Sequence, residues 1–181
     1  EGLQRCSTTR VAERAGVSVG SLYQYYPNRR CLLAAVLERH LVLVAESVEQ
    51  ACESRHGATA LEMARAVANS YLDAKLHEVE TSTALYAVLE EHGGALLVKD
   101  FRARMARSIA RMLGTASDRR FKDADTASEV VLSAIGGPIR AVLEKSVSAN
   151  MRRAIREHVV CVATSYLQAV SVARQKQPAS V

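Results

Sequence analysis

The sequence has no tryptophan and only two phenylalanines, so its core cannot rest mainly on large aromatic side chains. Glycine and proline are also scarce, at nine and three residues, which disfavours a turn-rich β fold. The hydrophobic share of 49% draws mostly on Ala, Val and Leu, which is enough to fill a core. The composition therefore predicts an all-α protein, and no period-two alternation indicates a strand.

Long hydrophobic runs are absent too. No run approaches the roughly 18 consecutive apolar residues of a membrane span, and no basic segment followed by an apolar one resembles a secretory signal. We therefore expect a cytoplasmic protein with no membrane partner. The sequence starts at Glu1 rather than methionine, which we interpret as a start inside a longer polypeptide.

Cysteines and histidines show none of the spacings that bind metals. The five histidines form no HExxH pair, and the four cysteines form no CxxC motif. We expect no metal, no cofactor and buried free thiols at these positions: Cys6, Cys31, Cys52 and Cys161.

Catalytic motifs are equally absent. The sequence has no nucleophile placed beside a base, no carboxylate pair in a motif and no phosphate-binding glycine loop. The nearest acidic and imidazole cluster is Glu90-Glu91-His92, whose adjacent side chains point in different directions around a helix. We therefore predict that the protein is not an enzyme.

The stretch SVGSLYQYYPNRR, residues 18–30, holds three of the six tyrosines. Ser7 can cap a first short helix that Gly16 ends in a left-handed turn, and Ser18 can cap a second helix that stops before Pro27. Two short helices around a glycine-containing turn predict a helix-turn-helix. Asn28 can cap a third, longer helix that runs to about residue 52.

Helical spacing separates the roles of the tyrosines. Leu22 and Tyr26 lie four residues apart and form a sensible core pair, which leaves Gln24 and Tyr25 towards solvent or a partner. Gln can read adenine, and a phenol can contact phosphate or a thymine methyl. An ordinary surface has the same composition, because helix-turn-helix pairs also occur in proteins that bind no DNA. The formal charge of +5 is compatible with an anionic partner.

The remaining chain predicts a series of amphipathic helices. We expect them at about residues 59–78, 82–91, 95–113, 124–145 and 149–173, with Gly136-Gly137-Pro138 interrupting the fourth. A break at SRHGAT suggests two domains. Residues 1–52 would hold the helix-turn-helix and its connecting helix, and residues 53–181 a helical domain.

The segment STTRVAERAGVSVGSLYQYYPNRRCLLAAVL, residues 7–37, strongly resembles the DNA-binding domain of TetR-family transcriptional regulators. The resemblance implies a dimeric repressor that binds double-stranded operator DNA and is released by a small molecule. It also implies a set of DNA-contacting residues: Thr8, Thr9, Val19, Gly20, Ser21, Tyr23, Gln24, Tyr25 and Arg29.

Several residues depart from the family pattern. Val19 stands where many members carry a polar residue, so contact with a thymine methyl is expected there. Arg30 and Cys31 replace a commonly acidic and a small residue. The family also has a complete helix before EGLQRCS that packs over the other two; this sequence lacks it, and we expect a weakened DNA-binding region.

The family resemblance further implies an effector pocket and a dimer interface in the second domain. Apolar walls with a few polar groups indicate the pocket: Tyr71, Tyr86, Leu89, His92, Met105, Ile109 and Met112. Apolar residues of the last two helices indicate a four-helix interface: Leu132, Ile135, Ile139, Ile155, Val159, Val162, Tyr166 and Val170. Both sets are also what an ordinary monomer core would contain.

The sequence leaves the role of one arginine stripe undecided and allows two other functions. Arg104, Arg107 and Arg111 line one helix face, which is a solvated surface or a site for an acidic ligand or a second stretch of nucleic acid. A DNA-binding activator or ligand-free member is an alternative to the repressor. A helical adaptor dimer that acts through protein contacts is another.

Overall fold

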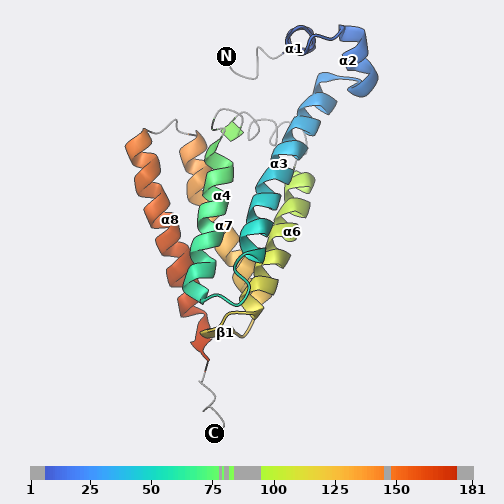
Figure 1. Cartoon of the computed structure of the whole chain (residues 1–181). Coiled ribbons are helices and arrows are strands. Elements are labelled where there is room, and N and C mark those ends of the chain that lie inside the picture. The colour runs from blue at the N-terminus through green and yellow to red at the C-terminus, as the bar shows by residue number, and fades with distance from the viewer. Residues whose placement is uncertain (1–6, 78, 80–81, 84–94, 145–147, 175–181) are drawn as a thin grey trace.

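The computed structural model describes residues 7–77, 79, 82–83, 95–144 and 148–174, and these are mainly helical, which confirms the all-α prediction. Figure 1 shows two short helices at one end, a long third helix leading away from them, and a bundle of upright helices beside it. The elements are α1 (Thr8–Ala15), α2 (Val19–Tyr25), α3 (Arg29–Glu53), α4 (Ala60–His77), α6 (Ala95–Gly114), β1 (Arg119–Phe121), α7 (Ala124–Glu144), α8 (Ala149–Ala169) and β2 (Ser171–Ala173).

Side-chain caps start the first three helices, as the sequence predicted. Ser7 Oγ, Ser18 Oγ and Asn28 Oδ1 each accept a hydrogen bond from the backbone N–H three residues later. Gly16 ends α1 at a φ of 68°, in the left-handed region where a residue without Cβ is favoured. These local contacts fix the turn between α1 and α2.

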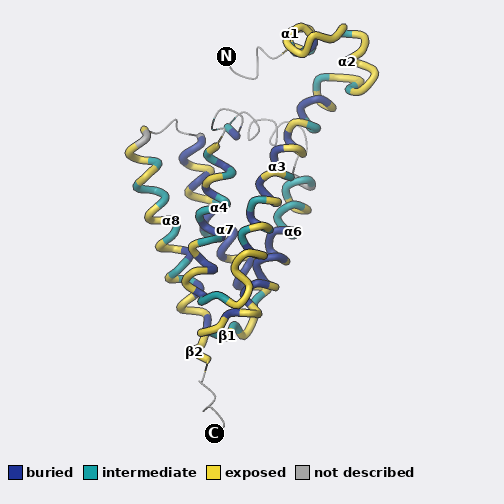
Figure 2. Tube along the Cα trace, in the orientation of Figure 1, coloured by how far each residue is buried: buried dark blue, intermediate teal, exposed yellow. Residues whose placement is uncertain are grey.

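Within the described residues, α3 joins a small hydrophobic core to a large one. Leu22 of α2 and Leu32 of α3 are buried with Ala12 in a small core beneath α1 and α2, and Tyr26 packs against it. This arrangement confirms the predicted pairing of Leu22 and Tyr26. Further along α3, Val44 joins the large core that α4, α6, α7 and α8 complete. Figure 2 shows this buried stripe continuing down α3 into the bundle.

A two-stranded sheet closes the far end of the bundle, where the sequence predicted no strand. β1 and β2 pair antiparallel, with Arg119 opposite Ala173 and Phe121 opposite Ser171. The predicted last helix is therefore too long, because α8 ends at Ala169 and the chain turns back along β1. Strands of three residues are too short to show a period-two pattern.

α7 passes through Gly136-Gly137-Pro138 without a break, so the predicted interruption is wrong. Pro138 is exposed and sits inside the helix, where it removes one backbone donor. At Gly136, α7 lies close to α4: a Cβ there would lie 3.5 Å from the hydroxyl of Tyr71 on α4.

α7 is also long and apolar enough, by length and composition, to cross a membrane. Its large side chains Leu132, Ile135 and Ile139 are instead buried in the bundle core. The helix is therefore apolar because it is the central core helix. Of the helix predicted over residues 82–91, residues 84–91 lie outside the described part of the chain.

Candidate functional site

The surface of α2 is polar and aromatic. Tyr25 is 80% exposed and Tyr23 is 43% exposed, while Leu22 faces the small core. Gln24, Ser21 and Gly20 are exposed as well. The helix thus presents amide, hydroxyl and phenol groups to whatever lies beyond it, which are the groups that contact bases and phosphates.

Three hydrogen bonds order this surface. The hydroxyls of Thr8 and Tyr23 lie 3.0 Å apart, which ties the start of α1 to α2. Ser18 and Ser21 are joined by their hydroxyls at 2.9 Å, and Ser18 Oγ also accepts the Ser21 backbone N–H. The side chain of Tyr23 is therefore held in place before any partner arrives.

The nine residues predicted to contact DNA fall on α1, α2 and the start of α3. Thr9 is exposed, whereas Thr8 and Arg29 are half-buried. Val19 is half-buried against the small core, so only part of its side chain is available to a partner. The structure thus brings the predicted residues together around one helix-turn-helix.

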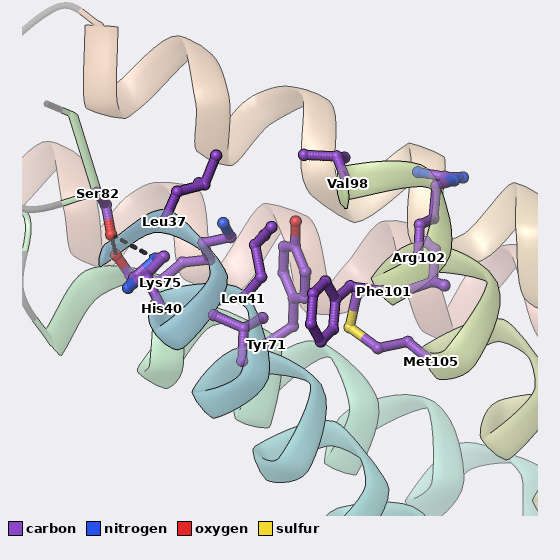
Figure 3. Close-up of a pocket in the computed structure, with 12 residues that line it drawn as sticks. Leu37, His40, Leu41, Tyr71, Lys75, Ser82, Val98, Phe101, Arg102 and Met105 are labelled. Atoms are coloured by element: carbon purple, nitrogen blue, oxygen red, sulfur yellow. Dashed lines mark hydrogen bonds between the residues drawn. The ribbon is translucent and has the colours of Figure 1, made fainter. Parts of the chain in front are cut away.

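A cavity lies in the bundle between α3, α4, α6 and α7 (Figure 3). Its empty space, counted with its opening to solvent, is about 640 Å³. The walls are mainly apolar, with a few polar groups. The lining residues are Leu37, His40, Leu41, Val44, Tyr71, Lys75, Ser82, Val98, Phe101, Arg102, Met105 and Leu132.

Three polar residues gather at one end of this cavity, as Figure 3 shows. The hydroxyl of Ser82 donates to the Lys75 carbonyl at 2.8 Å and lies 3.2 Å from His40 Nε2. Because a hydroxyl carries one hydrogen, Ser82 accepts from His40, which places a proton on Nε2. Lys75 is only 7% exposed, and burial lowers the pKa of its ammonium to about 8.

Arg102 contributes to the wall on the side of α6. Its Nε donates to a Glu129 carboxylate oxygen at 3.2 Å, and its Nη2 donates to the Ser133 hydroxyl at 2.5 Å. Both partners belong to α7. The guanidinium is therefore directed to α7, and its charge is balanced there by Glu129.

The predicted pocket residues divide into three groups. Tyr71 and Met105 line the cavity. Ile109 and Met112 are fully buried in the bundle core and do not line it. The other predicted pocket residues lie outside the described part of the chain: Tyr86, Leu89 and His92.

Lys75 was missed, although the sequence carries a signal for it. The buried positions of α4 recur at three- and four-residue steps and include Val67, Ala68 and Leu72. Lys75 is three residues beyond Leu72 on the same buried stripe. A lysine at such a position indicates a buried cation, which marks a candidate binding site.

Comparison with known families decides the classification. Residues 61–167, more than half of the chain, match the model of the "Tetracyclin repressor-like, C-terminal domain". The chain belongs to the TetR family. Residues 1–36 match the model "Bacterial regulatory proteins, tetR family", so the helix-turn-helix falls within the DNA-binding part of this family of transcriptional regulators.

A solved structure agrees with the TetR-family fold, and curated proteins match a short segment of the chain. A TetR transcriptional regulator from Rhodococcus sp. RHA1 superposes with a TM-score of 0.54 over 90% of this chain and 86% of its own, at 20% identity. The nucleoid occlusion factor SlmA of Glaesserella parasuis and of Actinobacillus pleuropneumoniae is 44% identical over 39 residues. That match spans 22% of this chain and only 19% of each relative.

The residues predicted as a TetR-type dimer interface do not all reach the surface. Four are buried in the core of a single chain, and the interface prediction is corrected for them: Leu132, Ile135, Ile139 and Val159. Ile155 and Tyr166 are half-buried against that core. Val162 and Val170 are 44% and 41% exposed on and just after α8. The exposed pair remains available to a second subunit.

Within the arginine stripe of α6, Arg104 forms an ion pair with Glu49 of α3. Arg104 donates two hydrogen bonds of 2.6 Å to the carboxylate of Glu49, which raises the pKa of its guanidinium. Arg111 donates to the Ser108 hydroxyl at 3.1 Å. Glu49 and Asp125 line the same shallow groove as these arginines, so its charge is mixed rather than uniformly positive.

The cysteines differ from the sequence expectation. Cys52 is buried, and burial raises the pKa of its thiol to about 12, whereas Cys31 and Cys161 are exposed. The prediction of buried thiols is therefore wrong for the latter two, and Cys6 lies outside the described residues. Within the described ranges, no cluster of three or more His, Cys, Asp or Glu side chains is placed to hold a metal ion.

Proposed function

We propose that this TetR-family chain is a non-enzymatic, dimeric repressor whose helix-turn-helix binds operator DNA and whose bundle cavity binds a small-molecule effector. The observation that carries the proposal is the course of α3. This single helix holds Leu32 in the core beneath the DNA-contacting helix and Leu41 in the wall of the cavity. A molecule in the cavity therefore touches the element on which the DNA-binding region is mounted.

The mechanism needs a difference in affinity between two states. Leu37, His40, Leu41 and Val44 of α3 all line the cavity, so an occupant selects α3 positions that leave room for it. A displaced α3 moves Leu32 and the helices packed on it. The effector binds the displaced state more tightly than the operator-binding state. Operator affinity falls by up to the ratio of these two effector affinities.

Dimerisation sets the geometry of DNA binding. Two helix-turn-helix units of a symmetric dimer occupy successive major grooves about 34 Å apart. Exposed apolar side chains on α7 and beside α8 support an interface there, among them Val130, Val162 and Val170. A change in the spacing of the two units is then enough to weaken operator binding.

The experiment is selection of bound duplexes from a randomised pool, followed by affinity and salt titrations. Gln24→Ala should relax the selected sequence and cost about 1–3 kcal/mol on the preferred site, because we propose that the exposed Gln24 reads a base. Arg29→Ala should weaken all sequences alike and lower the salt slope by about one, because we propose that Arg29 contacts phosphate.

Arg120→Ala serves as the matched control. Arg120 is exposed in β1, at the opposite end of the bundle from α2, and should leave binding unchanged (Figure 1). If no sequence is enriched, or if all three variants behave alike, operator binding through α2 is wrong.

A further inference from the structure

The walls of the cavity between α3, α4, α6 and α7 are built mainly from hydrocarbon side chains. Leu37 and Leu41 of α3 are buried and pack with Val98 and Phe101 of α6, and all four line the cavity (Figure 3). Met105 extends this apolar lining along α6. Among the described lining residues, none carries a carboxylate or a side-chain amide. An occupant therefore meets mostly methyl, methylene and aromatic groups.

The polar groups of the lining are already engaged within the protein. Arg102 donates from Nε to the Glu129 carboxylate and from Nη2 to the Glu129 carbonyl, so its charge is balanced on α7. The single hydroxyl hydrogen of Ser82 goes to the Lys75 carbonyl. The remaining polar side chains of the described lining each have an interaction partner in the protein as well: His40, Tyr71 and Lys75. A polar head group on a ligand therefore competes with partners that are already present.

We propose that the effector is an uncharged, mainly hydrocarbon molecule that binds between the apolar side chains of α3 and α6. The inference names the chemical class of the effector and rests on the proposed function for its regulatory meaning. Two observations carry it together, the apolar walls and the engagement of the described polar groups with one another. Such a cavity favours the removal of apolar surface from water.

A charged head group is disfavoured in this cavity for two reasons. An ion that enters gives up its water, and that loss costs free energy unless new partners replace the water. A carboxylate has to compete with the partners that Lys75 and Arg102 already have, and an ammonium would lie beside the same two basic side chains. A hydrocarbon has no hydrogen bonds with water to lose.

The test compares three ligands that share one ring system: 2-methylnaphthalene, 2-naphthoate and 2-naphthylmethylamine. A second set repeats the comparison on a smaller ring: p-xylene, 4-methylbenzoate and 4-methylbenzylamine. Binding is measured by calorimetry and by thermal shift at pH 7, where the acids are ionised and the amines are protonated. We expect the neutral member to bind at least about tenfold more tightly than either charged member in every set that binds. A charged member that comes within about tenfold of its neutral counterpart, or failure of both neutral compounds to bind, would overturn the proposal.

A cavity-filling variant locates the bound compound. Val98 is half-buried in the lining, and the larger ring of Val98→Phe occupies space that the ligand needs, so the neutral compound should bind at least about tenfold more weakly. Val172→Phe makes the same exchange at an exposed position of β2 and should bind like the wild type. Melting temperatures establish that the variants fold, and Leu41→Phe on α3 replaces Val98→Phe if the latter does not. Unchanged binding in the filled variant, or equal losses in it and in Val172→Phe, would contradict binding in this cavity.

An operator-release assay with the same compounds separates the two proposals. If the neutral compounds bind with the expected preference and release the operator, both hold. If they bind with that preference but leave operator binding unchanged, the ligand class stands and the inducer mechanism fails. If a charged member releases the operator and its neutral counterpart does not, the effector-controlled function stands and the proposed ligand class fails.

Discussion

Replacing Lys75 by methionine should stabilise the unliganded protein at neutral pH. Burial holds the pKa of Lys75 at about 8, against an ordinary value of 10.5. The difference is about 2.5 units, and each unit corresponds to about 1.4 kcal/mol, so the buried charge costs about 3 kcal/mol at low pH. Methionine fills a similar volume without a charge and should remove that cost.

The pH dependence of the stability difference identifies the buried charge of Lys75 as its cause. Between pH 8 and 10.5 the unfolded chain binds more protons at Lys75 than the folded chain does, so wild-type stability rises with pH in this window. The cost is fully present below pH 8 and has vanished above about pH 10.5. The stability advantage of Lys75→Met should therefore fall from about 3 kcal/mol at pH 7 towards zero.

Urea denaturation at pH 7, 8, 9, 10 and 11 measures the effect as a difference between variant and wild type. This difference cancels the contribution of Cys52, whose pKa of about 12 makes the fold less stable between pH 9 and 12 in both proteins. Lys122→Met, which replaces an exposed lysine before α7, provides the control and should show no difference.

Two results would refute the reasoning. A difference that is constant from pH 7 to 11 would mean that packing, not charge, separates the proteins. A loss of stability in Lys75→Met at pH 7 would mean that the ammonium makes interactions inside the fold that outweigh its desolvation.

Two further predictions concern the helices that frame the cavity. Thr59→Ala should lower the free energy of unfolding by about 1 kcal/mol, and Thr59→Ser should lower it much less. The hydroxyl and backbone N–H of Thr59 both donate to the Glu62 carboxylate, and the hydroxyl also accepts the Glu62 backbone N–H. Equal losses of stability for the two variants in urea denaturation would contradict this. Gly136→Ala should gain about 0.5–1 kcal/mol, since its Cβ meets the Tyr71 hydroxyl at an ordinary 3.5 Å. A Cβ at Gly137 would have no atom within 4 Å, so Gly137→Ala should gain as much stability. A loss of stability in Gly136→Ala alone would show that α4 and α7 cannot move apart enough to accept the added methyl group.

The parts of the fold that were predictable depend on short-range contacts. Ser7, Ser18 and Asn28 cap helices by reaching a backbone N–H three residues away, so the sequence alone indicates them. The strand Ser171–Ala173 depends instead on pairing with residues about 50 positions earlier. The residues next to Ser171–Ala173 in the sequence therefore do not indicate which distant strand it pairs with.

The cavity was predictable only in part for the same reason. Helical periodicity selects inward-facing residues, and it selected both Met105, which lines the cavity, and Ile109, which fills the core. The distinction depends on whether side chains of other helices fill the space in front of each residue. Leu132 illustrates the limit, since it was assigned to a dimer interface and lines the cavity within one chain.

The continuity of α3 connects the cavity to the DNA-binding region. A molecule bound in the cavity supplies a free energy of binding. That free energy becomes regulation only if the occupied state differs in shape at the DNA-binding end. Because α3 is helical without a break from Arg29 to Glu53, a shift at Leu41 is carried to Leu32 by a stiff element. In the proposed mechanism, α3 is therefore the mechanical link between the cavity and the DNA-binding region.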